Sequence, residues 1–197
     1  GFPGETNEDY RQQIELIKLL SHLPPPECVG DLWLERFSPY YTRPEEYGVT
    51  ITGPGEAYSY VYDSEDIDVM KIAYDFEFTT KNEIDLVLKE ELSKTVQEWK
   101  GRHQSDDIPY LFFTKSMNFV TVYDDRSIGN PVKNSFEGTP AWIIVFCNES
   151  PKTIDQIEKH VQELGIAETE VEKEILKLGK MGILYGEKGK YLTLALP

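Results

Sequence analysis

PYLFFTKSMNFVTVYDDR, residues 109–126, is the stretch that most clearly indicates a fold. Two runs rich in aromatic and β-branched residues, 110–114 and 119–123, flank a short polar segment near residues 116–118. This pattern predicts a β-hairpin. Residues 126–139 follow without a clear period, and we expect them to form a loop.

Helical spacing of apolar residues dominates the rest of this half of the chain. The predicted helices cover about 139–148, 153–163 and 168–181. Thr153 is placed to cap the second, and Gly182 to end the third. ILYGEKGKYLTLAL, residues 183–196, then predicts two short strands around a turn at Gly186–Gly189. Three helices followed by a hairpin indicate a winged helix-turn-helix.

The N-terminal half begins with the glycine-rich turn GFPGE, residues 1–5, followed by a predicted helix over 7–22 and the strand DLWLERFSPY, residues 31–40. Turn, helix and strand make a βαβ-like step. The Gly-, Pro- and Tyr-rich residues 41–60 predict irregular surface. The other predicted elements are a short helix or strand at 66–74 and a helix over 82–101. The polar segment HQSDDI, residues 103–108, suggests a boundary, so we predict an α+β protein with domains 1–102 and 103–197.

Composition limits the classes of partner. The 197 residues have a net charge of −15, which argues against nucleic acid, because phosphate binding needs a basic surface. We find no apolar run of about 18 residues, so we expect no membrane partner. Cys28 and Cys147 lie far apart, and the three histidines lack metal spacing, so no metal site is predicted in this chain.

Two stretches carry a resemblance to a known family. GFPGET, residues 1–6, is similar to a turn of radical S-adenosylmethionine enzymes, which follows a barrel strand. Pro24–Pro26, RFSPY at residues 36–40 and RPEEYG at residues 43–48 resemble cobalamin-dependent radical S-adenosylmethionine enzymes of ribosomal-peptide (RiPP) maturation. The terminal YLTLALP also resembles that family, so the resemblance spans most of the chain.

The resemblance implies that these residues form the C-terminal portion of a larger cytoplasmic enzyme, a probable peptide C-methyltransferase. They would comprise the last βα steps of its barrel and the winged-helix domain. The parent would hold a [4Fe–4S] cluster, S-adenosylmethionine and cobalamin. Its cluster needs C-x3-C-x2-C, and the two distant cysteines here do not match that motif. We therefore expect this chain alone to bind no cofactor. We also expect it to have no radical or methyl-transfer activity.

The same resemblance assigns cofactor contacts at the barrel rim, where barrel active sites lie. The predicted cofactor-binding residues are Gly1, Gly4, Glu5, Arg36, Ser38 and Tyr40. On the predicted strand, the last three alternate and share one face. The simpler alternatives are a helix-capping turn for residues 1–5 and a salt bridge from Arg36 to Glu35 or Glu45.

The C-terminal domain is similar to the small winged-helix elements that bind a precursor's leader peptide as an added strand beside the third helix. The predicted peptide-binding residues are Phe119, Val120, Val122, Tyr123, Lys173, Lys177 and Lys180. The implied partners are the leader peptide and the upstream domains of the parent chain. The alternative is that the hairpin only completes a core.

Two other functions remain open. The parent enzyme could act on a tetrapyrrole, as anaerobic cyclases with the same cofactors do. The domain could instead be a winged-helix DNA-binding regulator. In that case residues 168–182 would be the recognition helix, but its N-terminal half is acidic and has no Arg, Asn or Gln to read bases.

Overall fold

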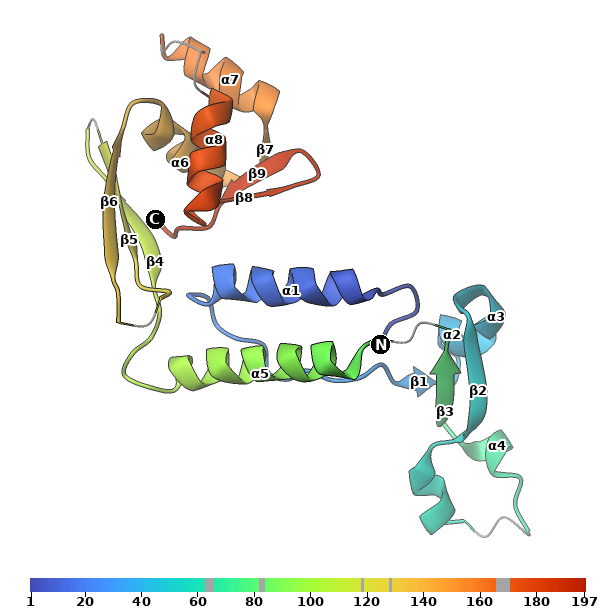
Figure 1. Ribbon diagram of the computed structural model, residues 1–197. Coiled ribbons are helices and arrows are strands. Elements are labelled where there is room, and N and C mark those ends of the chain that lie inside the picture. Colours follow the sequence, from blue (N-terminus) through green and yellow to red (C-terminus); the bar gives the residue numbers. More distant parts are fainter. Residues whose placement is uncertain (63–65, 82–83, 118, 128, 166–170) are drawn as a thin grey trace. The chain divides into compact units, whose positions relative to one another are not determined.

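The computed structural model describes residues 1–197 except 63–65, 82–83, 118, 128 and 166–170. The fold is α+β, with three small three-stranded antiparallel sheets and eight α-helices in the described residues (Figure 1). The chain forms two compact units. Unit 1 comprises Gly1–Ile14 and Pro26–Val96, and unit 2 comprises Glu15–Pro25 and Gln97–Pro197. Helices α1 (Asn7–Leu20) and α5 (Leu86–His103) contribute residues to both.

Unit 1 contains the sheet β1-β3-β2, in which both strand pairs are antiparallel. Its strands and remaining helices are β1 (Leu34–Glu35), α2 (Pro39–Thr42), α3 (Pro44–Tyr47), β2 (Val49–Pro54), the 3-10 helix η1 (Glu56–Tyr60), α4 (Val69–Ile72) and β3 (Asp75–Thr80). The predicted irregular segment 41–60 thus contains a strand. The βαβ-like step is absent from the described part of unit 1, because β1 pairs with β3 in the antiparallel sense.

The predicted strand over 31–40 is wrong beyond Glu35. Phe37 has a positive φ of 72°, which breaks the extended backbone. Ser38 then caps α2, and its hydroxyl accepts a hydrogen bond from the Tyr41 backbone N–H. Pro39 follows at the first helical position, where its fixed φ and missing N–H favour a helix start. The local capping chemistry therefore overrides the strand-like alternation.

The core cluster around the sheet of unit 1 is small. Leu34, Val49, Ala73 and Phe76 are buried at its centre. Four tyrosines pack against them: Tyr40, Tyr41, Tyr47 and Tyr58. These aromatic side chains pack the short helices against the sheet.

Unit 2 begins with the predicted hairpin, which the structure confirms as β4 (Leu111–Lys115) and β5 (Phe119–Asp124). A third strand, β6 (Val132–Glu137), occupies most of the predicted loop and pairs with β5. Its residues VKNSFE are mostly exposed and polar, so their pattern did not indicate a strand. The sheet order is β4-β5-β6, with β5 in the centre.

The three predicted helices follow, except that residues 168–170 of the third lie outside the described residues. The elements are α6 (Thr139–Glu149), β7 (Lys152–Thr153), α7 (Ile154–Glu163), α8 (Val171–Lys180), β8 (Leu184–Glu187) and β9 (Lys190–Thr193). Thr153 and Gln156 form a reciprocal capping box that starts α7. Gly182, with φ of 65°, follows the end of α8. The terminal hairpin is confirmed, and β7 extends it to the sheet β7-β9-β8.

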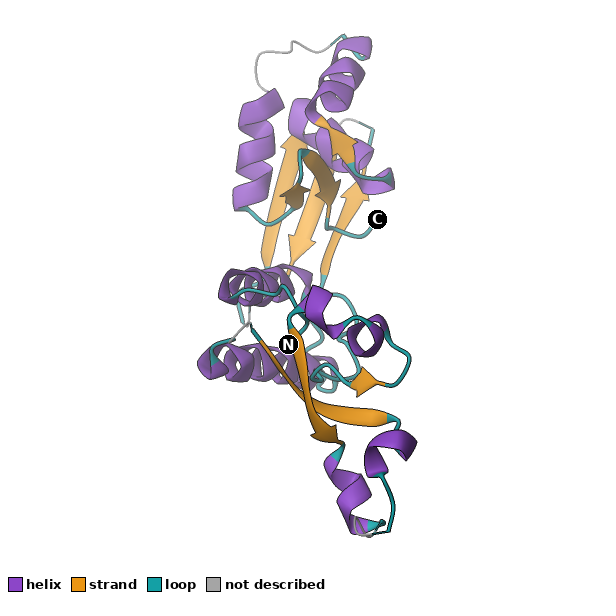
Figure 2. Cartoon of the chain, turned by 90° about the vertical axis from the view of Figure 1, so that its right-hand side faces the viewer, coloured by secondary structure: helices purple, strands orange, loops and turns teal. Residues whose placement is uncertain are grey.

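A single core joins these elements of unit 2. One face of β4-β5-β6 contributes Leu111, Phe113, Val120, Val122 and Phe136. Helix α6 is apolar around most of its circumference and is buried in this core with α7, α8 and the terminal sheet. Figure 2 shows the helices of unit 2 in purple beside the orange strands of its sheets. Helix α6 contacts β5 and β6, whereas α8 packs against α6, α7 and β8.

Candidate functional site

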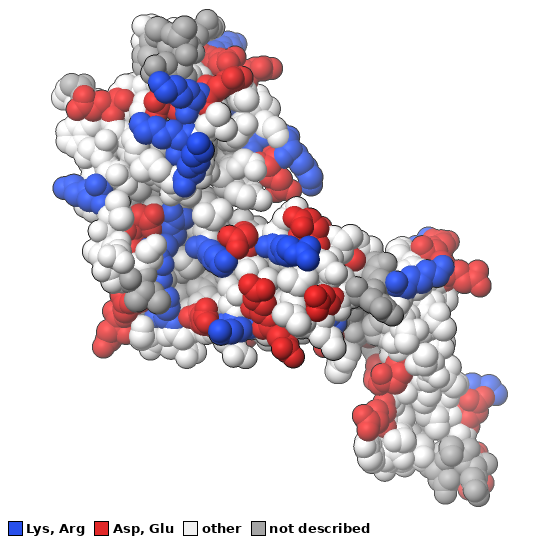
Figure 3. All heavy atoms as spheres, viewed as in Figure 1, with Lys and Arg blue, Asp and Glu red and all other residues white. Residues whose placement is uncertain are grey.

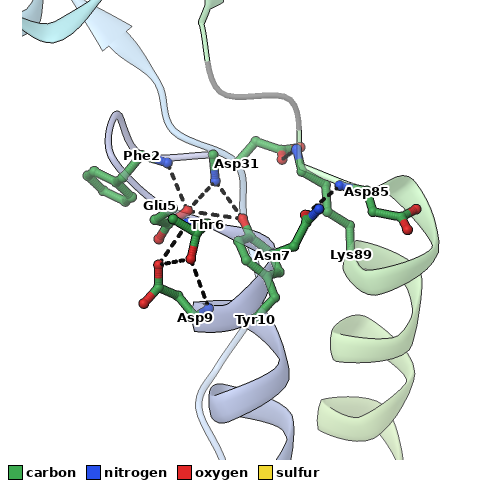
Figure 4. A network of polar contacts seen from close by, with 10 residues as sticks. Phe2, Glu5, Thr6, Asn7, Asp9, Tyr10, Asp31, Asp85 and Lys89 are labelled. Atoms are coloured by element: carbon green, nitrogen blue, oxygen red, sulfur yellow. Dashed lines mark hydrogen bonds and ion pairs between the residues drawn. The ribbon is translucent and has the colours of Figure 1, made fainter.

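The GFPGE turn is closed by hydrogen bonds within itself (Figure 4). The Glu5 N–H donates to the Phe2 carbonyl at 3.1 Å, and Glu5 Oε2 accepts from the Phe2 N–H at 3.0 Å. Gly4 has a φ of 96°, which a residue with a side chain would adopt only with strain. Thr6 and Asp9 then cap α1 reciprocally: the Thr6 N–H donates to Asp9 Oδ2 and the Asp9 N–H to Thr6 Oγ1. The cap of α1 is therefore made by Thr6 and Asp9, directly after the turn.

The Glu5 carboxylate forms its hydrogen bonds within the turn and with the start of α1. The buried Tyr10 hydroxyl donates to Glu5 Oε2 at 3.1 Å. Burial alone would raise the pKa of Glu5, but hydrogen bonds from the Gly1 amine, Tyr10 and the Phe2 N–H outweigh it and lower that pKa. Burial and the neighbouring Glu5 carboxylate raise the pKa of Tyr10 to about 12. Glu5 thus stays ionised and organises the turn.

One end of the turn borders a cavity of about 420 Å³ in unit 1. Gly1, Asp31, Trp33, Glu77 and Lys89 are among its lining residues. Lys89 Nζ lies 3.4 Å from Asp31 Oδ1, so these two residues form an ion pair in the wall of the cavity. Of the predicted cofactor contacts, Gly1 alone is among the residues that line this space.

Arg36 is bound to the protein's own backbone and not to the predicted carboxylates Glu35 or Glu45. Its Nε donates to the Ala73 carbonyl and its Nη2 to the Met70 carbonyl, both at 2.6 Å. The guanidinium carbon lies 5.0 Å from the Phe76 ring centroid. Arg36 therefore fastens the end of α4 onto the core of unit 1.

Ser38 and Tyr40 do not share a strand face with Arg36, which corrects the predicted arrangement. Ser38 caps α2. The Tyr40 ring lies edge-on to the Tyr47 ring at 4.8 Å and to the Phe2 ring at 6.3 Å, between centroids. The aromatic contact with Phe2 connects α2 to the GFPGE turn. Cofactor contact by these residues stays a prediction.

The predicted peptide-binding strand, β5, has no open edge. Its residues pair with β4 on one side and with β6 on the other. Val120 and Val122 are buried in the core, with 2% and 0% exposure. The expectation that these residues accept an added strand is therefore wrong. Phe119 is 42% exposed, and it lines a small cavity of about 130 Å³ together with Met117 and Trp142.

The open edge of this sheet belongs to β6. The opposite edge, along β4, is covered by the C-terminal segment: the Phe113 N–H donates to the Leu196 carbonyl and the Leu196 N–H to the Leu111 carbonyl. Among the residues the structure describes, β6 has β5 as its sole strand partner. Its outer backbone groups can therefore pair with another extended chain.

Helix α8 presents a mixed basic and apolar stripe. Lys173, Leu176, Lys177 and Lys180 follow the i, i+3, i+4, i+7 spacing of one helix face and are all exposed. Leu176 lies on the same face and is 66% exposed. Lys and Arg side chains gather over α8 in Figure 3, although the chain is acidic overall. The three predicted lysines are thus brought together on one face of α8.

A partly buried polar cluster in unit 2 was not predicted from the sequence. Arg126 pairs with Asp124 and also donates to the Leu19 and Gly182 carbonyls, each at 2.9 Å. His22 Nε2 contacts the Leu194 carbonyl at 2.9 Å. Asp124 and Arg126 belong to the charged run DDR after a strand, but the residues that they meet lie far away in the sequence, at the end of α1 and after α8. The cluster joins the ends of α1, β5 and α8.

Within the described residues, no group of three or more His, Cys, Asp or Glu side chains is arranged as metal ligands would be. No described helix combines the length and apolarity needed to cross a bilayer. Comparison of the chain with protein-family models, curated proteins and solved structures found no match. The functional assignment therefore depends on the residues themselves.

Proposed function

We propose that this chain is the C-terminal portion of a cobalamin-dependent radical S-adenosylmethionine enzyme that modifies ribosomally made peptides. The proposal further takes residues 103–197 as a winged-helix element that binds the precursor's leader peptide. It is supported by the motifs GFPGET, RFSPY and RPEEYG. It is also supported by the order of elements in unit 2, where three antiparallel strands precede three helices and a terminal hairpin that β7 completes.

The observation that carries the proposal is the open edge of β6. An extended peptide added to a strand edge gains backbone hydrogen bonds, while neighbouring side chains select its sequence. The lysines of α8 and the exposed Leu176 form a second candidate surface, suited to a peptide with acidic and apolar residues. The docking strand in this proposal is β6, in place of the β5 residues expected from the sequence.

The residues of this chain do not fit an iron–sulfur cluster. Cys28 is exposed and Cys147 is buried, and neither has a partner cysteine. Burial raises the pKa of the Cys147 thiol to about 12, against the opposing effect of Lys152, so it is a poor thiolate ligand. The proposal therefore assigns the cluster, S-adenosylmethionine chemistry and cobalamin to other regions of the parent enzyme. The free thiols are compatible with the cytoplasm, where we propose the enzyme acts.

The test is an NMR titration of the ¹⁵N-labelled chain with synthetic fragments of any short peptide encoded beside its gene. We expect the backbone amide signals of Val132–Glu137 to shift and their hydrogen exchange to slow, because strand addition gives them new partners. The β4 amides, whose edge is already covered, serve as the internal control. Absence of binding, or shifts confined to residues outside β6 and α8, would overturn the proposal.

A further inference from the structure

We infer that the peptide docked on β6 is selected by two opposite charges four residues apart, an acidic one beside Lys133 and a basic one beside Glu137. This inference rests on the proposed function, because it assumes that a strand is added at β6. It concerns the sheet face that points away from the core. No part of the α8 stripe is needed for it.

Three cross-strand rows cover this outer face, and each ends at β6. The first row is Phe112, Tyr123 and Lys133. The Phe112 and Tyr123 rings stack at 4.9 Å between centroids, with planes 14° apart, and Lys133 Nζ lies 5.4 Å from the Tyr123 centroid. The ammonium group is thus held over an aromatic ring at the open edge.

The second and third rows differ in chemistry from the first. In the second row, Thr121 and Ser135 are paired, and their hydroxyl oxygens lie 3.1 Å apart. In the third row, the exposed Phe119 is paired with Glu137. The outer side chains along this edge are therefore a cation, a hydroxyl and an anion. They belong to Lys133, Ser135 and Glu137, every second residue of β6.

Both edge charges are available to a partner. Lys133 and Glu137 are exposed, and within the described part of the chain neither forms an ion pair. A strand added beside β6 would place every second side chain on this outer face, about 5 Å from its neighbour on β6. Opposite charges in such positions are favourable and like charges are unfavourable. A peptide with a carboxylate beside Lys133 and a cation beside Glu137 therefore complements both charges of the β6 edge.

The experiment selects binders from a displayed library of random dodecapeptides with the full 197-residue chain. Selected peptides are first sorted by whether they shift the β6 amide signals. Among those that do, we expect enrichment of an opposite-charge pair at i and i+4. The control for a general electrostatic effect is a scrambled peptide of the same composition, which should bind at least about fivefold more weakly.

A charge-swapped protein then tests the geometry. Lys133→Glu combined with Glu137→Lys leaves the net charge unchanged, and we expect it to weaken the selected peptides about tenfold. Peptides with their two charges exchanged should recover that loss. The matched control swaps the exposed neighbours Glu187 and Lys188 of the terminal hairpin, and should leave affinity unchanged.

The outcomes separate the two claims. If peptides bind at β6 without the charge pair, or ignore the swap at residues 133 and 137, the charge selection is overturned while the proposed function stands. If no selected peptide shifts the β6 amides, both are overturned. The one outcome that supports the inference is that the charge-exchanged peptides recover their affinity for the charge-swapped protein.

Discussion

Arg126 donates two hydrogen bonds to the carboxylate of Asp124, from Nε to Oδ1 at 2.9 Å and from Nη2 to Oδ2 at 2.6 Å. The arginine side chain is only 9% exposed. Burial would raise the pKa of Asp124, but Arg126 outweighs that effect and lowers it. Because the same guanidinium reaches the carbonyls of Leu19 and Gly182, this pair fixes the ends of two helices against β5.

Arg126→Met should destabilise unit 2 by about 2–4 kcal/mol, because it leaves a half-buried carboxylate and two carbonyls without their donor. Urea unfolding followed by tryptophan fluorescence measures this loss. Lys188→Met removes an exposed ion pair with Glu187 and should cost less than about 1 kcal/mol. Equal losses in the two variants would contradict the structural role of Arg126.

Acidification should destabilise the fold through His22. The pKa of His22 is lowered, mainly by burial and also by the nearby Arg126. The Leu194 and Leu19 carbonyls and the Asp124 carboxylate act in the opposite direction but do not outweigh burial. As the pH falls below the ordinary value of 6.5, the unfolded chain binds a proton that the folded chain resists, so the free energy of unfolding decreases. Urea unfolding between about pH 7 and pH 5 measures the slope. His22→Gln should flatten it, and an unchanged slope would exclude His22 as its source.

Gly182→Ala should be more costly than Gly189→Ala, although both glycines have positive φ angles, 65° and 74°. A Cβ at Gly182 would lie 2.9 Å from Leu19 Cδ2 and 3.1 Å from Arg126 Nη2, whereas nothing lies within 4 Å of one at Gly189. We expect about 1–2 kcal/mol from backbone strain at Gly189. At Gly182 we expect at least about 1 kcal/mol more. Thermal unfolding of the two variants tests the difference, and equal losses would argue against close packing there.

One of the two cysteines should react with a thiol reagent in the folded protein. Cys28 is exposed, whereas Cys147 is fully buried with a raised pKa of about 12. Only the thiolate is an effective nucleophile. Both the burial of Cys147 and its raised pKa therefore protect it from the reagent. Spectrophotometric titration should count one thiol in buffer and two in urea. Two rapid reactions in buffer would contradict the packing of α6.

Val122→Asp should unfold unit 2 and not merely weaken peptide binding. Val122 is fully buried in the central strand, and an unpaired charge there should cost more than about 4 kcal/mol. Thr114→Asp, at an exposed position of the neighbouring strand, should cost less than about 1 kcal/mol. Circular dichroism and thermal unfolding of both variants make the comparison, and a folded, stable Val122→Asp would contradict the register of the sheet.

Local sequence predicted much of the helical structure. The helices α1, α5, α6 and α7 and both hairpins were predicted near their observed positions, because apolar spacing and capping residues such as Thr153 report on neighbours in the chain. The lysines of α8 were grouped for the same reason, since i, i+4 and i+7 share a helix face. These features need no knowledge of distant residues.

The candidate site was predicted less well. The apolar alternation of Phe119–Tyr123 correctly indicated a strand, but it could not tell a central strand from an edge strand. That distinction depends on β6, whose polar residues gave no strand pattern, and on the C-terminal segment that covers β4. Likewise, the alternation of Arg36, Ser38 and Tyr40 was overridden by the capping of α2.

By itself, then, the sequence of this protein determined its helices, its turns and the composition of its α+β core, because periodicity and capping act over a few residues. The tertiary structure alone decided which strand edge is open, which charges reach it, and how Arg126 meets Asp124, Leu19 and Gly182. Strand pairing and buried polar contacts join residues that are distant in the chain, so no local pattern specifies them.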